Sequence, residues 1–431
     1  MRRWLVGLCL CSVALSPTFG EEEFTFDFSE VEPEAYTYGG YLEFRPALSL
    51  PQSDSVLYGL NYPGDEGPET ETRYLLRARL EGTYDWDDVH LQLRTNSDLV
   101  RSDGGWSSTS SVHEAFASWQ VDPYLTVDVG KKLTKWGTGY SWSPVAFLDR
   151  PKDPDEPDLP RAGYTLLSAD YVKTFPGSLQ NVGVTLAVIP RTNHVNSDFG
   201  STRHTNYAGR LHLLWDDTDI DLMALSGGSE PVRYGLDFAR NLKTNFEIHG
   251  EWSHTPSERR TSVAADGTLR TGDSSVDRVL LGLRYLTPSD VTYILEYQYN
   301  GFGFSQANMR DFYTFANEAV DSYTATGDAT QLARARLLNR QLYSSRPLGK
   351  RYLYLRASQK EPNDILYFTP AVTLQVNMDD SSFSVIPEAL YTGYENWELR
   401  ARIFVLGGSS LSEFGSKPNR ARFELMARRF F

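Results

Sequence analysis

The sequence predicts an all-β fold: a transmembrane antiparallel β-barrel of about 18 strands with long external loops, 16 strands being the alternative count. Segments of about ten residues alternate apolar and polar side chains along most of the 431 residues, as barrel strands do. The chain also contains 25 Tyr, 22 Phe and 9 Trp, and such rings favour membrane interfaces. No run of roughly 20 apolar residues occurs, which excludes a helical membrane protein.

The first 20 residues have the features of a secretory signal peptide. Arg2 and Arg3 form a positive start, residues 5–15 are an apolar stretch, and the small residue Gly20 precedes the expected cleavage site. Both cysteines, Cys9 and Cys11, lie in this segment, so we expect a mature chain without disulfides or Cys-ligated metal. Residues 21–34 are then expected to form a periplasmic segment, too short for the plug of a TonB-dependent transporter, and residues 35–431 the barrel.

The alternation assigns each strand one lipid-facing and one lumen-facing side. In the segment 72–84, Leu76 and Leu80 lie on one face, whereas Arg77 and Arg79 lie on the other. The same pattern predicts strands at 35–48, 72–84, 88–99, 111–121, 124–136, 163–175, 180–190, 203–215, 219–228, 231–241, 244–254, 276–287, 290–302, 349–359, 365–377, 382–392, 395–406 and 419–431. Aromatic residues near the strand ends are expected at the membrane interfaces: Tyr36, Tyr38, Tyr84, Trp86, Trp215, Trp252, Tyr285, Tyr293 and Trp397.

The connections between these segments alternate in length. Short turns follow the even-numbered segments, and most long connections follow the odd-numbered ones, which is typical of short periplasmic turns and long external loops. An even number of strands would place both termini in the periplasm. Three connections are large: 137–162, 255–275 and 303–348. The last contains two helix-like stretches, 307–321 and 329–343, for which an external cap and a lid or plug remain open alternatives.

The C-terminal segment alternates up to a final aromatic residue, Phe431. It resembles the closing strand of bacterial outer-membrane barrels, although Arg429 stands where such strands usually carry an apolar residue. The resemblance implies recognition by the barrel-assembly machinery and contact with outer-membrane lipids. The formal net charge of −14 argues against nucleic-acid binding.

The most distinctive motif lies around the connection 137–162. Its residues are Trp136, Gly137, Gly139, Tyr140, Trp142, Pro144, Pro151, Lys152, Asp153 and Pro154. Together with the hairpin that runs from 114–119 to 127–131, this motif resembles a family of bacterial porin-like outer-membrane proteins that includes the alginate-export type of porin. The resemblance implies an 18-stranded pore for diffusion of hydrophilic solutes and no catalytic residues.

The polar faces of the predicted strands supply a charged pore lining. One arc is rich in arginine: Arg45, Arg77, Arg79, Arg94, Arg400, Arg402, Arg422 and Arg428. The arc across the barrel is more acidic: Asp237, Glu247, Glu251 and Glu296. A lining polarised in this way would favour anionic or zwitterionic hydrophilic solutes, such as acidic sugars. In the alternative interpretation, these charges pair with one another and only solvate the wall.

The functional hypothesis is therefore a porin-like channel for passive passage of small hydrophilic solutes, anions included. An occluded structural or partner-binding barrel is the alternative. An outer-membrane hydrolase is a third hypothesis, supported only by the proximity of His254 and Ser257, without a hydrolase motif. We expect no cofactor and no metal; the acidic stretch 149–158 could offer oxygen ligands to Ca²⁺ but lacks EF-hand spacing.

Overall fold

The computed structural model describes residues 35–64, 67–102, 104–344 and 347–431. The expected signal peptide (1–20) and periplasmic segment (21–34) lie outside the described residues. The strands are β1 Tyr36–Pro51, β2 Glu71–Trp86, β3 Val89–Ser102, β4 Gly105–Asp122, β5 Leu125–Lys132, β6 Tyr164–Thr174, β7 Leu179–Ile189, β8 Asn206–Trp215, β9 Thr218–Gly227, β10 Arg233–Lys243, β11 Phe246–Val263, β12 Leu269–Leu286, β13 Val291–Asn300, β14 Arg351–Gln359, β15 Phe368–Asn377, β16 Ser382–Tyr391, β17 Trp397–Gly407 and β18 Asn419–Phe430. The helices are α1 Val56–Asn61, α2 Gln306–Thr326, α3 Thr330–Leu342 and the 3-10 turn Pro362–Asp364.

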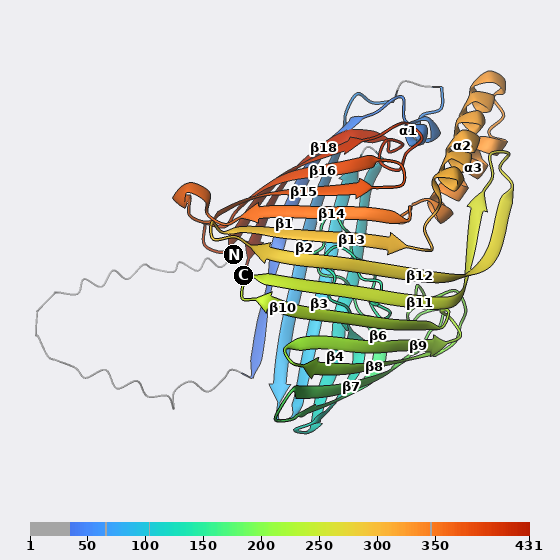
Figure 1. Ribbon diagram of the computed structural model, residues 1–431. Coiled ribbons are helices and arrows are strands. Elements are labelled where there is room, and N and C mark those ends of the chain that lie inside the picture. Colours follow the sequence, from blue (N-terminus) through green and yellow to red (C-terminus); the bar gives the residue numbers. More distant parts are fainter. Residues whose placement is uncertain (1–34, 65–66, 103, 345–346) are drawn as a thin grey trace, which may run out of the picture. The chain divides into compact units, whose positions relative to one another are not determined.

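The eighteen strands form one closed antiparallel barrel, as the sequence predicts (Figure 1). Each strand pairs with its neighbours in the sequence, and β1 pairs with β18 from Tyr41↔Phe430 to Leu50↔Ala421. Closure leaves no unpaired strand edge, which a hydrocarbon environment requires. Each of the eighteen predicted segments overlaps one observed strand.

The short turns lie at the end of the barrel where β1 begins and β18 ends. The β8–β9 turn consists of Asp216 and Asp217, at φ 46° and 58°, a left-handed pair that fits a tight hairpin. Gly40 and Phe431 exchange backbone hydrogen bonds of 3.1 and 3.2 Å at the same end. By the arrangement common to outer-membrane barrels, this end is periplasmic and the other end is external.

The prediction of a large loop at 255–275 is wrong. β11 continues to Val263 and β12 begins at Leu269, so a paired hairpin extends above the barrel wall and only a short turn remains. Arg259 pairs with Asp273 across the hairpin at 2.9 Å. Above the membrane neither face needs apolar residues, so the alternation disappears while the backbone pairing continues. The same reason explains why residues 100–102 and 105–110 are paired strand rather than loop.

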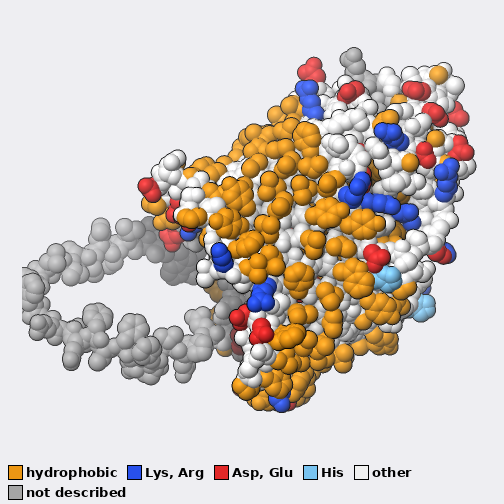
Figure 2. Space-filling model, in the orientation of Figure 1, with side chains coloured by type: hydrophobic (Ala, Val, Ile, Leu, Met, Phe, Trp, Pro, Cys, Tyr) orange, Lys and Arg blue, Asp and Glu red, His pale blue; other side chains and the backbone are white. Residues whose placement is uncertain are grey.

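The outer face of the barrel carries a broad apolar surface. Leucine and aromatic side chains of the strands point outward and are exposed, for example Phe44, Leu80 and Leu281. Figure 2 shows this surface as an apolar area over the strands. Of the aromatic residues expected at the interfaces, Tyr36 and Trp86 are exposed at the periplasmic end. None of the helices in the described residues has the length and apolar character to cross a membrane.

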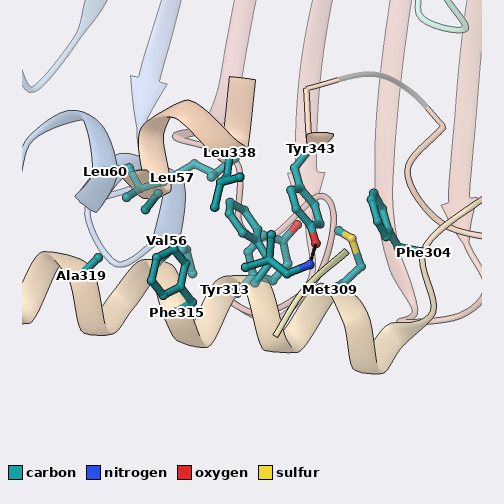
Figure 3. Packing of buried hydrophobic residues seen from close by; sticks show 14 of the residues in the cluster. Val56, Leu57, Leu60, Phe304, Met309, Tyr313, Phe315, Ala319, Leu338 and Tyr343 are labelled. Atoms are coloured by element: carbon teal, nitrogen blue, oxygen red, sulfur yellow. Dashed lines mark hydrogen bonds between the residues drawn. The ribbon is translucent and has the colours of Figure 1, made fainter. Parts of the chain in front are cut away.

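The external end carries a helical cap. α2 and α3, predicted from the sequence, pack with α1 and with Val263 of the β11–β12 hairpin in one buried apolar cluster (Figure 3). The rings of Phe312 and Tyr343 stack at 3.9 Å, and the backbone N–H of Val263 donates to the Tyr343 hydroxyl at 3.2 Å. Of the two alternatives for 303–348, the external cap describes this packing, because the helices pack against one another and against other external connections.

Candidate functional site: a loop across the lumen

The connection between β5 and β6, residues 133–163, folds into the barrel; we call it the lumen loop. Its backbone meets inward carboxylates of β11 and β13, and its acidic tip meets inward arginines of β1 and β17. Because consecutive strands are neighbours around the barrel, β11 and β13 lie across the lumen from β1 and β17. The loop therefore spans the lumen and is fixed at both walls.

Glu251 of β11 fixes the first turn of the lumen loop. Its Oε1 accepts from the backbone N–H groups of Thr138 and Gly139 at 2.7 and 2.6 Å. Its Oε2 accepts from the Ser143 hydroxyl at 2.9 Å and from the Val145 N–H at 3.2 Å. The carboxylate is buried. Four donors satisfy a charge that would otherwise be costly to bury.

Glu296 of β13 fixes the next residues in the same way. It accepts from the backbone N–H groups of Tyr140 and Ser141, from the Ser141 hydroxyl and from Nε2 of His249, the last at 3.0 Å. The sequence placed Glu251 and Glu296 among the pore-lining acids. Both are on the inward face, but they lie under the lumen loop and anchor it, so neither side chain is open to a passing solute.

Two glycines of the motif allow this close approach. Gly137 has φ 90°, and a Cβ there would lie 2.0 Å from Ser143 Oγ and 2.8 Å from Glu251 Oε1. A Cβ on Gly139 would lie 2.1 Å from the Trp142 carbonyl oxygen. Only glycine lets the backbone reach the wall carboxylate at these positions.

The far end of the lumen loop is held by Glu156. Its carboxylate accepts from Arg45 at 2.8 and 3.1 Å and from Arg402 at 3.3 Å, and Arg400 lies at 3.7 Å. Burial alone would raise the pKa of Glu156, but the Arg45 hydrogen bond and the charges of Arg402, Arg45 and Arg400 outweigh burial and lower this pKa to about 2. Sequence analysis did not predict that Glu156 contacts these arginines. Arg45 and Glu156 are 111 residues apart, and contacts at that separation leave no local sequence pattern.

Most arginines of the predicted arc form a paired lattice with wall carboxylates. Arg428 binds Glu43 at 2.6 Å and Glu398 at 3.0 Å, and Arg400 also binds Glu398 at 2.7 Å. Further pairs join Arg45 to Glu43, Arg402 to Glu424, Arg77 to Asp98, and Arg94 to Glu81 and Glu114. For these residues the geometry agrees with the alternative interpretation of mutually paired wall charges.

Arg79 and Arg422 differ from that lattice. Arg79 donates to Asn96 Oδ1 at 2.8 Å and is only 4% exposed, so it cannot contact a solute. The Arg422 side chain is 38% exposed, its contact with Glu424 is 4.0 Å long, and its guanidinium lies 3.8 Å from the ring centre of Phe404. Arg422 also lines two adjoining cavities of about 180 and 370 Å³. Of the arginines in the predicted arc, it is therefore the most open to the lumen and the most weakly paired.

The acidic arc is mostly covered. Asp237 is fully buried, and neither of its oxygens has a hydrogen-bond donor. Its register partners are also acids, Asp221 on β9 and Glu251 on β11. Glu247 is partly exposed, 3.5 Å from His249. Only Glu247 of the four predicted acids retains an open side chain.

The remaining motif residues shape the lumen loop itself. Trp136 is buried in one apolar cluster with Phe147, and Trp142 packs in another with Tyr352. The ammonium group of Lys152 donates to the carbonyl oxygens of Gly139 and Tyr140. A cavity of about 450 Å³ opens beside the loop; Pro144, Pro151, Lys152 and Arg161 are among its lining residues.

The acidic stretch 149–158 acts in hydrogen bonds within the barrel. The Asp149 carboxylate accepts from the N–H of Trp136 at 2.9 Å, and the Asp158 carboxylate accepts from the Tyr140 hydroxyl at 2.9 Å. The Asp153 carboxylate accepts from the backbone N–H of Asp155 at 3.0 Å. Over the described ranges, no group of three or more His, Cys, Asp or Glu is arranged to hold a metal ion.

The comparisons with known proteins agree with this architecture. A family model described as phosphate-selective porin O and P matches residues 51–189, which include the lumen loop. The crystal structure of Acinetobacter baumannii OccAB1 aligns at 10% identity and a TM-score of 0.53, covering 92% of this chain and 97% of that one. Pseudomonas aeruginosa OccK5 (OpdH) aligns at 11% identity and a TM-score of 0.50, covering 91% and 98%. No curated protein matches the chain.

These similarities cover the barrel and its lumen loop. They show a porin-like β-barrel fold, which agrees with the exposed apolar surface over the strands. The chain is a porin-like β-barrel of the bacterial outer-membrane type.

Proposed function

We propose that the protein is a passive outer-membrane channel for small hydrophilic solutes, with a preference for anions. The observation that carries the proposal is the charged lumen crossed by a loop that carboxylates and arginines fix at both walls. A loop held in this way narrows the passage and requires no energy-coupled movement. The remaining passage beside the loop has a polar, charged wall, which favours small hydrophilic solutes over apolar ones.

The preference for anions is supported by cationic side chains that form no short ion pair with a carboxylate of the wall. Arg422 has the most open side chain among the arginines of the predicted arc. Beside the 450 Å³ cavity, Lys152 and Arg161 donate to backbone carbonyl oxygens, which leave their positive charge in place. The family whose model matches residues 51–189 is described as phosphate-selective, which agrees with this sign of charge.

Solute uptake into liposomes tests the proposal. Swelling rates are compared for a neutral sugar and a sugar acid of equal size, for the native channel, Arg422→Gln and the buried control Arg79→Gln. We expect the native channel to admit the sugar acid faster than its neutral analogue, and Arg422→Gln to reduce that advantage more than Arg79→Gln. Equal reductions in both variants would refute the role of Arg422. A folded barrel that admits neither sugar would favour the occluded structural or partner-binding alternative.

We also propose the export route and the layout of the chain. Residues 1–20 direct secretion and are removed, residues 21–34 remain in the periplasm, and the barrel begins near residue 35. Amino-terminal sequencing of the purified protein should then begin at Glu21. The barrel-assembly machinery recognises the last strand, ending at Phe431, so deletion of Phe431 should lower the yield of assembled barrel in the outer membrane.

A further inference from the structure

The periplasmic turn between β14 and β15 differs from the other short turns. It spans residues 360–367 and is the longest connection at that end of the barrel. Other turns at that end are shorter and polar, such as 216–217 and 287–290. In Figure 1 the 360–367 turn extends beyond the adjacent strand ends, on the side where the C-terminus lies. Because shorter turns connect the other strands at this end, the extra residues of this turn are not needed to connect β14 and β15.

The turn presents contiguous apolar side chains to its surroundings. Ile365, Leu366 and Tyr367 are 51%, 62% and 54% exposed, and Tyr394 of the next periplasmic turn is 62% exposed. The backbone N–H of Thr392 donates to the Tyr367 carbonyl at 3.1 Å, which holds the two turns together. We call Ile365, Leu366, Tyr367 and Tyr394 the rim patch. Exposed apolar groups gathered in this way mark an interaction surface.

The conformation of the turn is fixed by its own hydrogen bonds. The N–H of Glu361 donates to the Phe368 carbonyl, and the Glu361 carboxylate accepts from the N–H of Tyr367, both at 2.9 Å. Glu361 and Tyr367 have φ of 49° and 63°, which non-glycine residues adopt only where the surroundings hold them. The exposed apolar side chains are thus part of a built structure.

The rim patch is continuous with the lipid-facing surface of the barrel. Phe368, the next residue after the turn, pairs in register with Tyr391, whose ring centre lies 5.5 Å from that of Tyr394. Tyr367, Tyr394 and Trp397 also line one groove of about 430 Å³. This aromatic row joins the outer wall of β15–β17 to the turn, beside the polar residues Thr392, Glu395, Asn396 and Glu398 of the same groove. Lipid that covers the wall can therefore extend to the turn.

We propose that the rim patch inserts into the inner leaflet of the outer membrane and anchors the periplasmic rim there. Its occupant is the interfacial region of the phospholipids, where tyrosine and aliphatic side chains are both stable. The neighbouring charges are Lys360 and the acids Glu361, Asp364 and Glu395, which together are net negative, so attraction to anionic headgroups does not drive the contact. Apolar burial drives it, as for an interfacial anchor.

Depth-dependent fluorescence quenching tests this proposal on the full barrel. The native cysteines are Cys9 and Cys11, within the expected signal peptide, so Leu366→Cys gives one labelling site in the mature chain. The variant is labelled with nitrobenzoxadiazole and reconstituted into vesicles with or without brominated phospholipid. Leu80→Cys, on the lipid-facing wall, and Leu337→Cys, on α3 of the external cap, are the membrane and water controls; both side chains are exposed.

We expect brominated lipid to quench the label at residue 366 to the same degree as the label at residue 80, and to leave the label at residue 337 unchanged. Quenching at residue 366 as low as at residue 337 would overturn the proposal. So would disulfide-linked dimers of Leu366→Cys in the membrane, because they would assign the patch to a second copy. If Leu366→Cys fails to assemble, Tyr394→Cys carries the same measurement with the same two outcomes.

Discussion

At the scale of single residues, buried carboxylates with different surroundings determine how the lumen is built. Glu251 and Glu296 each accept four hydrogen bonds, most of them from the lumen loop. Asp237 is equally buried, beside Asp221 and Glu251, and accepts none. Carboxylates on one wall therefore contribute in opposite directions to stability.

Replacement by amides should reveal that difference. Glu251→Gln keeps one acceptor oxygen and turns the other into a donor that faces the Ser143 hydroxyl and the Val145 N–H. We expect it to lower the free energy of unfolding by about 1–3 kcal/mol. Asp237→Asn changes a side chain that accepts no hydrogen bond and lies beside two other acids, so it should not destabilise the barrel. Urea unfolding in detergent micelles, followed by tryptophan fluorescence, measures both. Equal destabilisation by the two changes would contradict the assignment of Glu251 as the anchor.

Glu156 leads to a prediction about acid. Its pKa in the folded protein, about 2, lies below the ordinary 4.5, so its stabilising contribution is complete above pH 4.5 and is lost as the pH falls toward 2. Single-channel current should therefore stay equally quiet from pH 7 to pH 5 and become noisier only in stronger acid. Glu156→Gln should be noisy already at pH 7. A native channel that becomes noisy near pH 6 would contradict this anchoring role.

At the scale of elements, the first turn of the lumen loop depends on a glycine that sequence patterns alone do not explain. Gly139→Ala would place a methyl group 2.1 Å from the Trp142 carbonyl, so the turn must move away from Glu251. Gly272→Ala, on the external hairpin, meets nothing within 4 Å and is the matched control. We expect limited proteolysis to cut residues 133–163 in Gly139→Ala but not in Gly272→Ala or the native barrel. Equal resistance in all three would show that the turn tolerates the methyl group.

The helical cap is a second element with its own core. Phe312→Ala removes the ring stacked on Tyr343 and should cost about 3–5 kcal/mol within the cap. Because the strands pair independently of the cap, the barrel should remain heat-modifiable on a denaturing gel, while hydrogen exchange in residues 306–342 rises. Loss of heat-modifiability would mean that the barrel needs the cap to fold.

At the scale of the whole molecule, the sequence predicted the barrel well because strand periodicity is local. Alternation of period two located each strand from β1 to β18, and the helix-like stretches 307–321 and 329–343 located α2 and α3; α1 was not predicted. The 255–275 hairpin was missed because paired strands outside lipid lose that alternation. The sequence predicted which side chains face the lumen but not which of them are exposed. Glu251 and Asp237 face inward as expected, yet both are buried in the folded barrel.

We propose that this closed, charged barrel conducts small ions through a lumen narrowed by residues 133–163. The measurement that tests it most directly is the current through single refolded barrels in a planar bilayer, followed by the reversal potential in a salt gradient. We predict discrete stable conductance steps and a reversal potential shifted toward that of the anion. A cation-shifted potential would contradict the anion preference, and the absence of any conductance from well-folded barrels would contradict the channel itself.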